Sequence, residues 1–198
     1  LVDAPDSLGE TRAQGPVLGI GLDLLSPESL EIQRLNVDQS VVRGRLPVER
    51  GEALLSDEFA SRIGVVPGDE VTLIGSGMNA SMVMYNFTIS GTLGFGVEIM
   101  DKGTLVADIQ DVRMALDMED AAGEILGFLA TGFYDDHKTR EMAAGFNKLY
   151  ENDPDSFAPV MKSLSQQGSM GQYVQLSNVW AWYISLVFIL AMSIVLWN

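Results

Sequence analysis

The stretch at residues 54–71 reads LLSDEFASRIGVVPGDEV and decides the fold class. The run EALLS at 52–56 is β-prone, and Ser56 is a preferred N-cap residue for a short helix reaching Arg62. Pro67-Gly68-Asp69 predicts a turn, and EVTLIGS at 70–76 predicts the next strand. A strand, a short helix, a turn and a strand in so few residues predict an α+β domain.

Further elements are expected on both sides of this stretch. An apolar spacing at Ile109, Val112 and Leu116 predicts a helix, and Ser26-Pro27 predicts the start of a short helix within 25–36. Residues 1–16 are polar and turn-rich without periodicity, so no element is predicted there. Additional strands are predicted at 17–23, 41–45, 81–95, 104–108, 123–134 and 157–164, and an amphipathic helix is predicted at 135–152.

The C-terminal part predicts a membrane span. Residues 179–197 read VWAWYISLVFILAMSIVLW, in which 17 of 19 residues are apolar and none is charged. A helix of that length covers roughly 28 Å, close to the thickness of a bilayer's hydrocarbon core. Trp180, Trp182 and Tyr183 at one end and Trp197 at the other resemble an aromatic belt and are the expected membrane anchors. A buried core helix is the alternative.

The preceding linker indicates the orientation of that span. Residues 163–178 contain no charge, and positive charges collect on the cytoplasmic side of spans. We therefore expect residues 1–178 outside the cytoplasm, with the span in the inner membrane.

Composition excludes several functions. The 198 residues carry 12 basic and 27 acidic side chains, a net charge of −15, which argues against nucleic-acid binding and against electrostatic docking on anionic lipid. There is no cysteine and one histidine, so thiolate chemistry and a two-histidine metal site are impossible.

No motif predicts a catalytic, cofactor or metal site. Asp135-Asp136-His137 reads as a solvated helix start rather than as a general-base or metal site, although an extracytoplasmic enzyme using His137 is a minor alternative. The glycines at 91–96 lack the order of a phosphate loop.

Four stretches together resemble a known family. They are GIGLD with SPE (19–23 and 26–28), VRGRLP (42–47), the opening stretch (54–71) and ISGTL through Asp101 (89–101). In this order, and followed by an apolar run, they resemble the extracytoplasmic domain of the ABC-transporter permeases that include the lipoprotein-releasing permeases, the MacB macrolide exporter and the cell-division protein FtsX. The first stretch departs from the family's turn by an insertion.

The resemblance implies a split, porter-like α/β lobe with an inserted β-rich lobe, followed by a transmembrane helix. The α/β lobe would comprise residues 1–40, which look incomplete, and 108–164. The insert would be 41–107, the linker 165–178 and the helix 179–197.

The resemblance also implies a function. Such a domain would engage a lipoprotein, peptide or amphiphile, with ATP hydrolysed on a separate ATPase subunit and with a second permease subunit alongside. The alternative is a membrane-tethered, FtsX-like adaptor that regulates a cell-wall hydrolase. The predicted partner contacts are the apolar residues Phe95, Val97, Ile99 and Met100 and a basic patch at Arg43 and Arg45.

Overall fold

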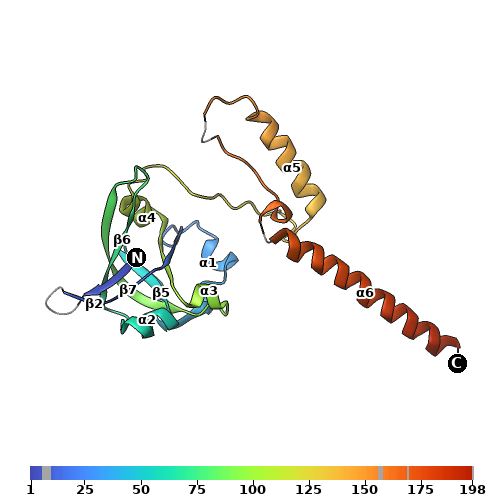
Figure 1. Cartoon of the computed structure of the whole chain (residues 1–198), viewed down its shortest axis with the longest axis horizontal. Helices are drawn as coiled ribbons and strands as arrows, with labels where there is room; N and C mark the ends of the chain where they lie inside the picture. The colour runs from blue at the N-terminus through green and yellow to red at the C-terminus, as the bar shows by residue number, and fades with distance from the viewer. Residues whose placement is uncertain (6–9, 156–157, 169, 198) are drawn as a thin grey trace. The chain divides into compact units, whose positions relative to one another are not determined.

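The computed structural model describes residues 1–5, 10–155, 158–168 and 170–197 and has a mixed α+β fold (Figure 1). The described residues form one eight-stranded mixed sheet and six α-helices. The α+β class predicted from the sequence is therefore confirmed. The chain divides into two compact units, Leu1–Ile125 and Leu126–Asn198.

The first unit contains all the strands of the sheet. The strands are β1 (Val2–Pro5), β2 (Thr11–Gly15), β3 (Leu18–Leu22), β4 (Val41–Gly44), β5 (Glu52–Ser56), β6 (Glu70–Ser76), β7 (Met82–Leu93) and β8 (Thr104–Asp108). The helices of this unit are α1 (Glu31–Arg34), α2 (Asp57–Ile63), α3 (Glu98–Asp101) and α4 (Ile109–Leu116), with a 3-10 turn η1 (Asp38–Ser40).

The sheet has the order β2-β1-β6-β7-β5-β8-β3, and β4 pairs with the last part of β7. The β3–β8 and β5–β7 pairs are parallel, and the other pairs are antiparallel. Strands from residues 1–40 and from residues 41–107 are thus hydrogen-bonded within a single sheet.

Hydrophobic side chains cover both faces of the central strand β5. Because successive side chains of a strand point to opposite faces, Leu55 joins the cluster under α2 and Leu54 joins the cluster on the other face. Phe59 of α2 is fully buried against the first cluster, where its burial contributes about 2–3 kcal/mol. The sheet core is therefore closed on both sides at β5.

Residues 54–71, the stretch quoted at the start of the sequence analysis, fold as expected with one difference. Asp69 accepts a hydrogen bond from the Val66 N–H (3.0 Å) at the predicted turn, and Gly64 ends α2 in the left-handed conformation. Ser56 occupies the N-cap position, but its side chain does not cap the helix. Its hydroxyl instead accepts the Thr104 N–H (3.1 Å), because Ser56 is fully buried beside β8.

Three local expectations were wrong. Residues 1–16 contain the β1–β2 hairpin, whose Val2 and Ala4 are buried in the sheet core. Residues 123–134 form no strand, and neither do residues 158–164. The remaining residue of the predicted closing strand, 157, lies outside the described residues.

The second unit contains α5 (Asp136–Leu149), a 3-10 turn η2 (Leu164–Gln166) and α6 (Met170–Trp197). The Asn147 side-chain amide makes two hydrogen bonds with the Met161 backbone (2.9 and 2.8 Å), which ties α5 to the returning chain. A helix within the predicted range 135–152 is confirmed, and Ala143 is its buried residue. In the part of the chain that the structure describes, no helix meets the length and apolarity needed to cross a bilayer.

Candidate functional site

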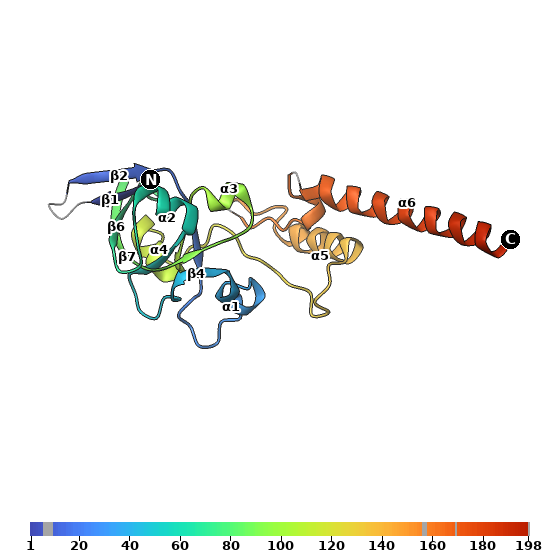
Figure 2. The ribbon, with the colours of Figure 1, turned by 90° about the horizontal axis from the view of Figure 1, so that it is seen from below.

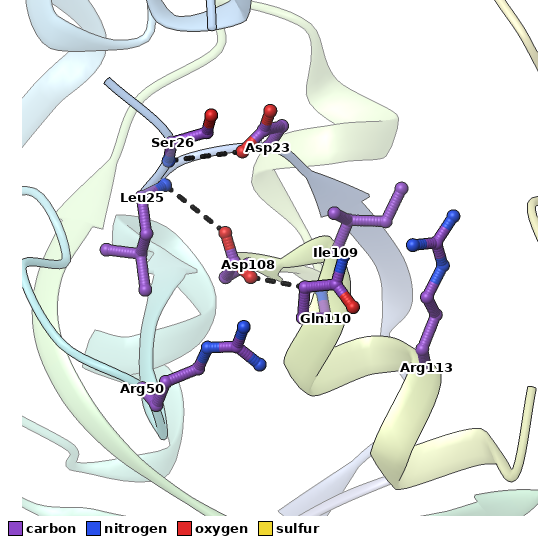
Figure 3. Close-up of a pocket in the computed structure, with 8 residues that line it drawn as sticks. All are labelled: Asp23, Leu25, Ser26, Arg50, Asp108, Ile109, Gln110 and Arg113. Atoms are coloured by element: carbon purple, nitrogen blue, oxygen red, sulfur yellow. Dashed lines mark hydrogen bonds between the residues drawn. The ribbon is translucent and has the colours of Figure 1, made fainter. Parts of the chain in front are cut away.

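A polar pocket of about 470 Å³ lies where β3 and β8 end and α4 begins (Figure 3). Parallel strands such as β3 and β8 bring their carboxyl ends to the same sheet edge, where ligands of α/β folds often bind. The residues that line the pocket are Asp23, Leu25, Ser26, Arg50, Asp108, Ile109, Gln110 and Arg113.

Asp108 holds the pocket's backbone in place. Its Oδ1 accepts the Gln110 N–H (3.0 Å) and so caps α4. Its Oδ2 accepts the N–H groups of Leu24 and Leu25, each at 3.2 Å. The residue is only 2% exposed. Asp108 therefore fixes the segment after β3 to the start of α4.

Two arginines bring positive charge to the pocket. Arg50 Nη1 lies 3.8 Å from Asp111 Oδ1, and the Arg50 side chain is 56% exposed. Arg113 donates its Nε–H to the Ala121 carbonyl (2.8 Å). Figure 3 draws Arg50, from the loop before β5, and Arg113, from α4, on opposite sides of Gln110.

Behind Arg50 lies the fully buried Asp111. Its Oδ2 accepts the Gly51 N–H (2.9 Å), and within the described residues its Oδ1 accepts no hydrogen bond. Burial raises the pKa of the neighbouring Tyr85, the Asp111 carboxylate raises it further, and Arg50 opposes the shift. Asp111 thus depends on the loose ion pair with Arg50 for its counter-charge.

This arrangement suits binding. The pocket's described lining combines two guanidinium groups, the carboxylates of Asp23 and Asp108, a serine hydroxyl and an amide, and it includes neither histidine nor lysine. Among the described residues, no cluster of three or more histidine, cysteine or acidic side chains could hold a metal ion. The pocket can therefore accommodate a small polar group that donates and accepts hydrogen bonds.

Arg43 and Arg45, the predicted basic patch, are engaged within the fold. Arg43 Nε donates to Asp57 Oδ1 at 2.6 Å. The pKa of Asp57 is lowered chiefly by the Thr92 hydroxyl, which donates to the same oxygen, and further by Arg43. Arg45 makes two hydrogen bonds to Glu52. These arginines neutralise carboxylates at β5 and α2.

The predicted apolar contact residues fall into two groups. Val97 and Ile99 are 50% and 82% exposed, at and within α3. Phe95 instead packs against the hydrophobic cluster containing Leu93, and its N–H donates to Asp101 Oδ1 (2.7 Å). Met100 is partly buried. Only Val97 and Ile99 of this set are thus well exposed.

The aromatic residues of the apolar run lie on α6. Trp180, Trp182, Tyr183 and Trp197 are 53–94% exposed, and the Trp180 and Tyr183 rings make an edge contact at 6.1 Å.

At the start of α5, Asp135 accepts the Lys138 N–H (3.0 Å) as N-cap, and His137 is exposed. The reading of this triplet as a helix start is confirmed.

No protein-family model and no curated protein sequence matches this chain.

The pocket was not predicted from the sequence. Of its residues, Asp108 is the one that a local sequence pattern could have identified. An aspartate between a β-prone run and a helical apolar spacing marks a strand-to-helix junction. The pairing of that junction with residues 23–26 has no local signal.

Proposed function

We propose that this chain is the extracytoplasmic domain of an ABC-transporter permease subunit, joined to a membrane-spanning helix in the inner membrane. The domain would engage a lipoprotein, peptide or amphiphile. A separate ATPase subunit would supply the driving force, and a second permease subunit would complete the transporter. Residues 1–178 would lie outside the cytoplasm.

The observation that carries the proposal is the surface of α6. The large apolar side chains described between Val179 and Trp197 are 40–94% exposed. The residues of this run include no Asp, Glu, Lys or Arg. Large apolar side chains exposed around a charge-free helix favour an apolar environment, and we propose that this environment is lipid.

The order of elements gives further support. The stretch with the strongest resemblance, 54–71, forms β5, α2 and a turn before β6, in the sequence that the resemblance implies. Of the lobe assigned to 1–40 and 108–164, β3 and α4 are a strand and a helix, and β3 joins the sheet through β8 of the assigned insert. The antiparallel β6–β7 pair fits the β-rich insert assigned to 41–107.

The membrane part is tested with the full chain expressed in its native membrane. We expect it to resist alkaline carbonate extraction. A Leu186→Arg, Leu190→Arg variant should become extractable, because each charge at mid-bilayer costs about 3 kcal/mol. Val66→Arg, at a half-exposed position of the first unit, is the matched control and should remain in the membrane. Extraction of the unaltered chain would overturn the membrane-spanning helix.

The transporter part is tested by purifying the full-length protein in mild detergent and assaying ATP hydrolysis. A stoichiometric ATPase subunit with measurable turnover supports the permease function. A membrane-anchored chain that binds an outer hydrolase, without any ATPase, would replace it with the adaptor function.

A further inference from the structure

Residues 126–133, LGFLATGF, form an uncharged loop that we call the apolar loop. Leu126 is 62% exposed and Phe133 is 82% exposed. A turn forms in the second half of the loop, where the Gly132 N–H donates to the Leu129 carbonyl (3.0 Å) with Gly132 at φ +72°. With Phe128 at 56% exposed, three large apolar side chains are exposed within eight residues, and such a group is typical of a contact surface.

The end of the apolar loop is hydrogen-bonded to the segment just before α6. The Ser165 N–H donates to the Tyr134 hydroxyl (3.2 Å), and that hydroxyl donates to Asp136 Oδ1 (2.5 Å). Arg140 Nε also donates to the Ser165 hydroxyl (3.1 Å). Ser165 belongs to η2, which packs against α6, so the loop ends where this helix starts, as Figures 1 and 2 show.

The distances allow the apolar loop to reach the same bilayer as α6. The uncharged apolar run begins nine residues after Met170, about 13 Å along the helix. Eight residues of loop span up to about 27 Å when extended. Leu126, eight residues before the hydrogen-bonded Tyr134, can therefore reach a membrane entered by the apolar part of α6, whereas Phe133 lies one residue from Tyr134 and meets the membrane at the headgroup side of its interface.

We propose that the apolar loop inserts Leu126 and Phe133 into the interface of a zwitterionic bilayer beside α6, which rests on the membrane-spanning helix proposed above. The loop has no lysine or arginine, and the chain carries a net charge of −15, so insertion relies on apolar contact rather than on anionic lipid. Its non-helical backbone must stay hydrated, which places the loop at the boundary between headgroups and acyl chains.

The chain contains no cysteine, so single cysteines can report the depth of chosen residues. The full chain is labelled with an environment-sensitive fluorophore at Leu126→Cys or Phe133→Cys and reconstituted into phosphatidylcholine vesicles containing nitroxide-labelled lipid. Phe188→Cys on α6 reports the proposed span. Lys148→Cys, exposed at the other end of α5, is the matched control outside the loop.

We expect quenching at 126 and 133 to exceed quenching at 148 by about threefold. Quenching at 188 with none above the control at 126 and 133 would overturn the loop's insertion and leave the span intact. Absence of quenching at 188 would overturn the membrane-spanning helix. If residues 126 and 133 were quenched in that case, lipid contact by the loop would still be supported. If residues 126 and 133 were not quenched either, both the span and the loop's insertion would be overturned. Quenching at the loop that requires added phosphatidylglycerol would overturn the apolar mechanism.

Discussion

Arg45 and Glu52 face each other in a two-pronged ion pair, with Nη1–Oε2 at 2.8 Å and Nη2–Oε1 at 2.5 Å. The Glu52 side chain is 7% exposed and that of Arg45 is 52% exposed. Glu52 Oε2 also accepts the Val48 N–H at 2.8 Å. The pair thus fixes the turn between β4 and β5 to the first residue of β5.

This ion pair predicts an acid-sensitive stability. Arg45, helped by the Val48 and Glu49 N–H groups, lowers the pKa of Glu52 from about 4.5 to about 2, although burial opposes the shift. Because the pKa is lower in the folded state, the stabilisation is present above about pH 4.5 and is lost as the pH falls toward 2. Denaturant unfolding of the full chain in detergent at successive pH values should show this loss.

The Glu52→Gln variant isolates that contribution. The variant should unfold more easily at pH 7 and should lose stability less steeply between pH 4.5 and 2, because residue 52 no longer titrates. Glu49→Gln, at an exposed neighbour, should keep the slope of the unaltered protein. An unchanged slope in Glu52→Gln would show that other carboxylates carry the acid sensitivity.

Replacing Asp108 should loosen the pocket. Asp108→Ala removes the α4 cap and leaves the buried Leu24 N–H without its acceptor, at a combined cost of about 2–4 kcal/mol in unfolding free energy. Hydrogen exchange should show faster exchange of the Leu24 and Gln110 amides. Glu119→Ala, at an exposed site beyond α4, should change neither measurement. Unchanged exchange in Asp108→Ala would contradict its role in holding the segment.

Two glycines with positive φ should respond differently to alanine. Gly44 has φ +76°, and a Cβ there would lie 2.3 Å from the Ser90 carbonyl oxygen. Gly51 has φ +80°, but a Cβ there meets open space. Gly51→Ala should cost about 1–2 kcal/mol from backbone strain alone. Gly44→Ala should cost clearly more, because backbone must also move. Equal costs in thermal unfolding would mean that β4 shifts freely away from β7.

Local sequence patterns correctly predicted the elements whose boundaries are set by turn and cap residues within the same stretch. The turn residues around Gly68 and the helix start after Ser56 predicted β5, α2 and β6 nearly to the residue. The β-prone residues 123–134 have the composition of a strand, but a strand also needs a partner, and within the described residues none pairs with them. Composition alone therefore overpredicted a strand where the sheet-forming unit ends and the second unit begins.

The pocket could not be predicted because it depends on pairing between distant segments. Leu24 and Asp108 meet only because β3 aligns in parallel with β8, which places Leu22 opposite Asp108. No spacing within either segment encodes that register. The same limit explains why Arg43 and Arg45 were interpreted as a free patch, since their carboxylate partners lie 14 and 7 residues away on other elements.

The exposed residues of α3 provide the cleanest test of partner contact. Changing Arg43 and Arg45 to glutamate would set carboxylates against Asp57 and Glu52 and destabilise the fold, so a loss of binding would be ambiguous. Ile99→Ser, at a residue 82% exposed, should change the unfolding free energy by less than about 0.5 kcal/mol.

If α3 contacts the cargo or outer partner, Ile99→Ser should weaken capture of the protein that co-purifies with the full chain by about tenfold, since losing an interface anchor costs more than 1 kcal/mol. Val66→Ser, half-exposed near the end of α2, is the matched surface control and should retain capture. Equal capture by both variants would remove α3 from the contact surface, and would direct the search to the pocket lined by Arg50 and Arg113.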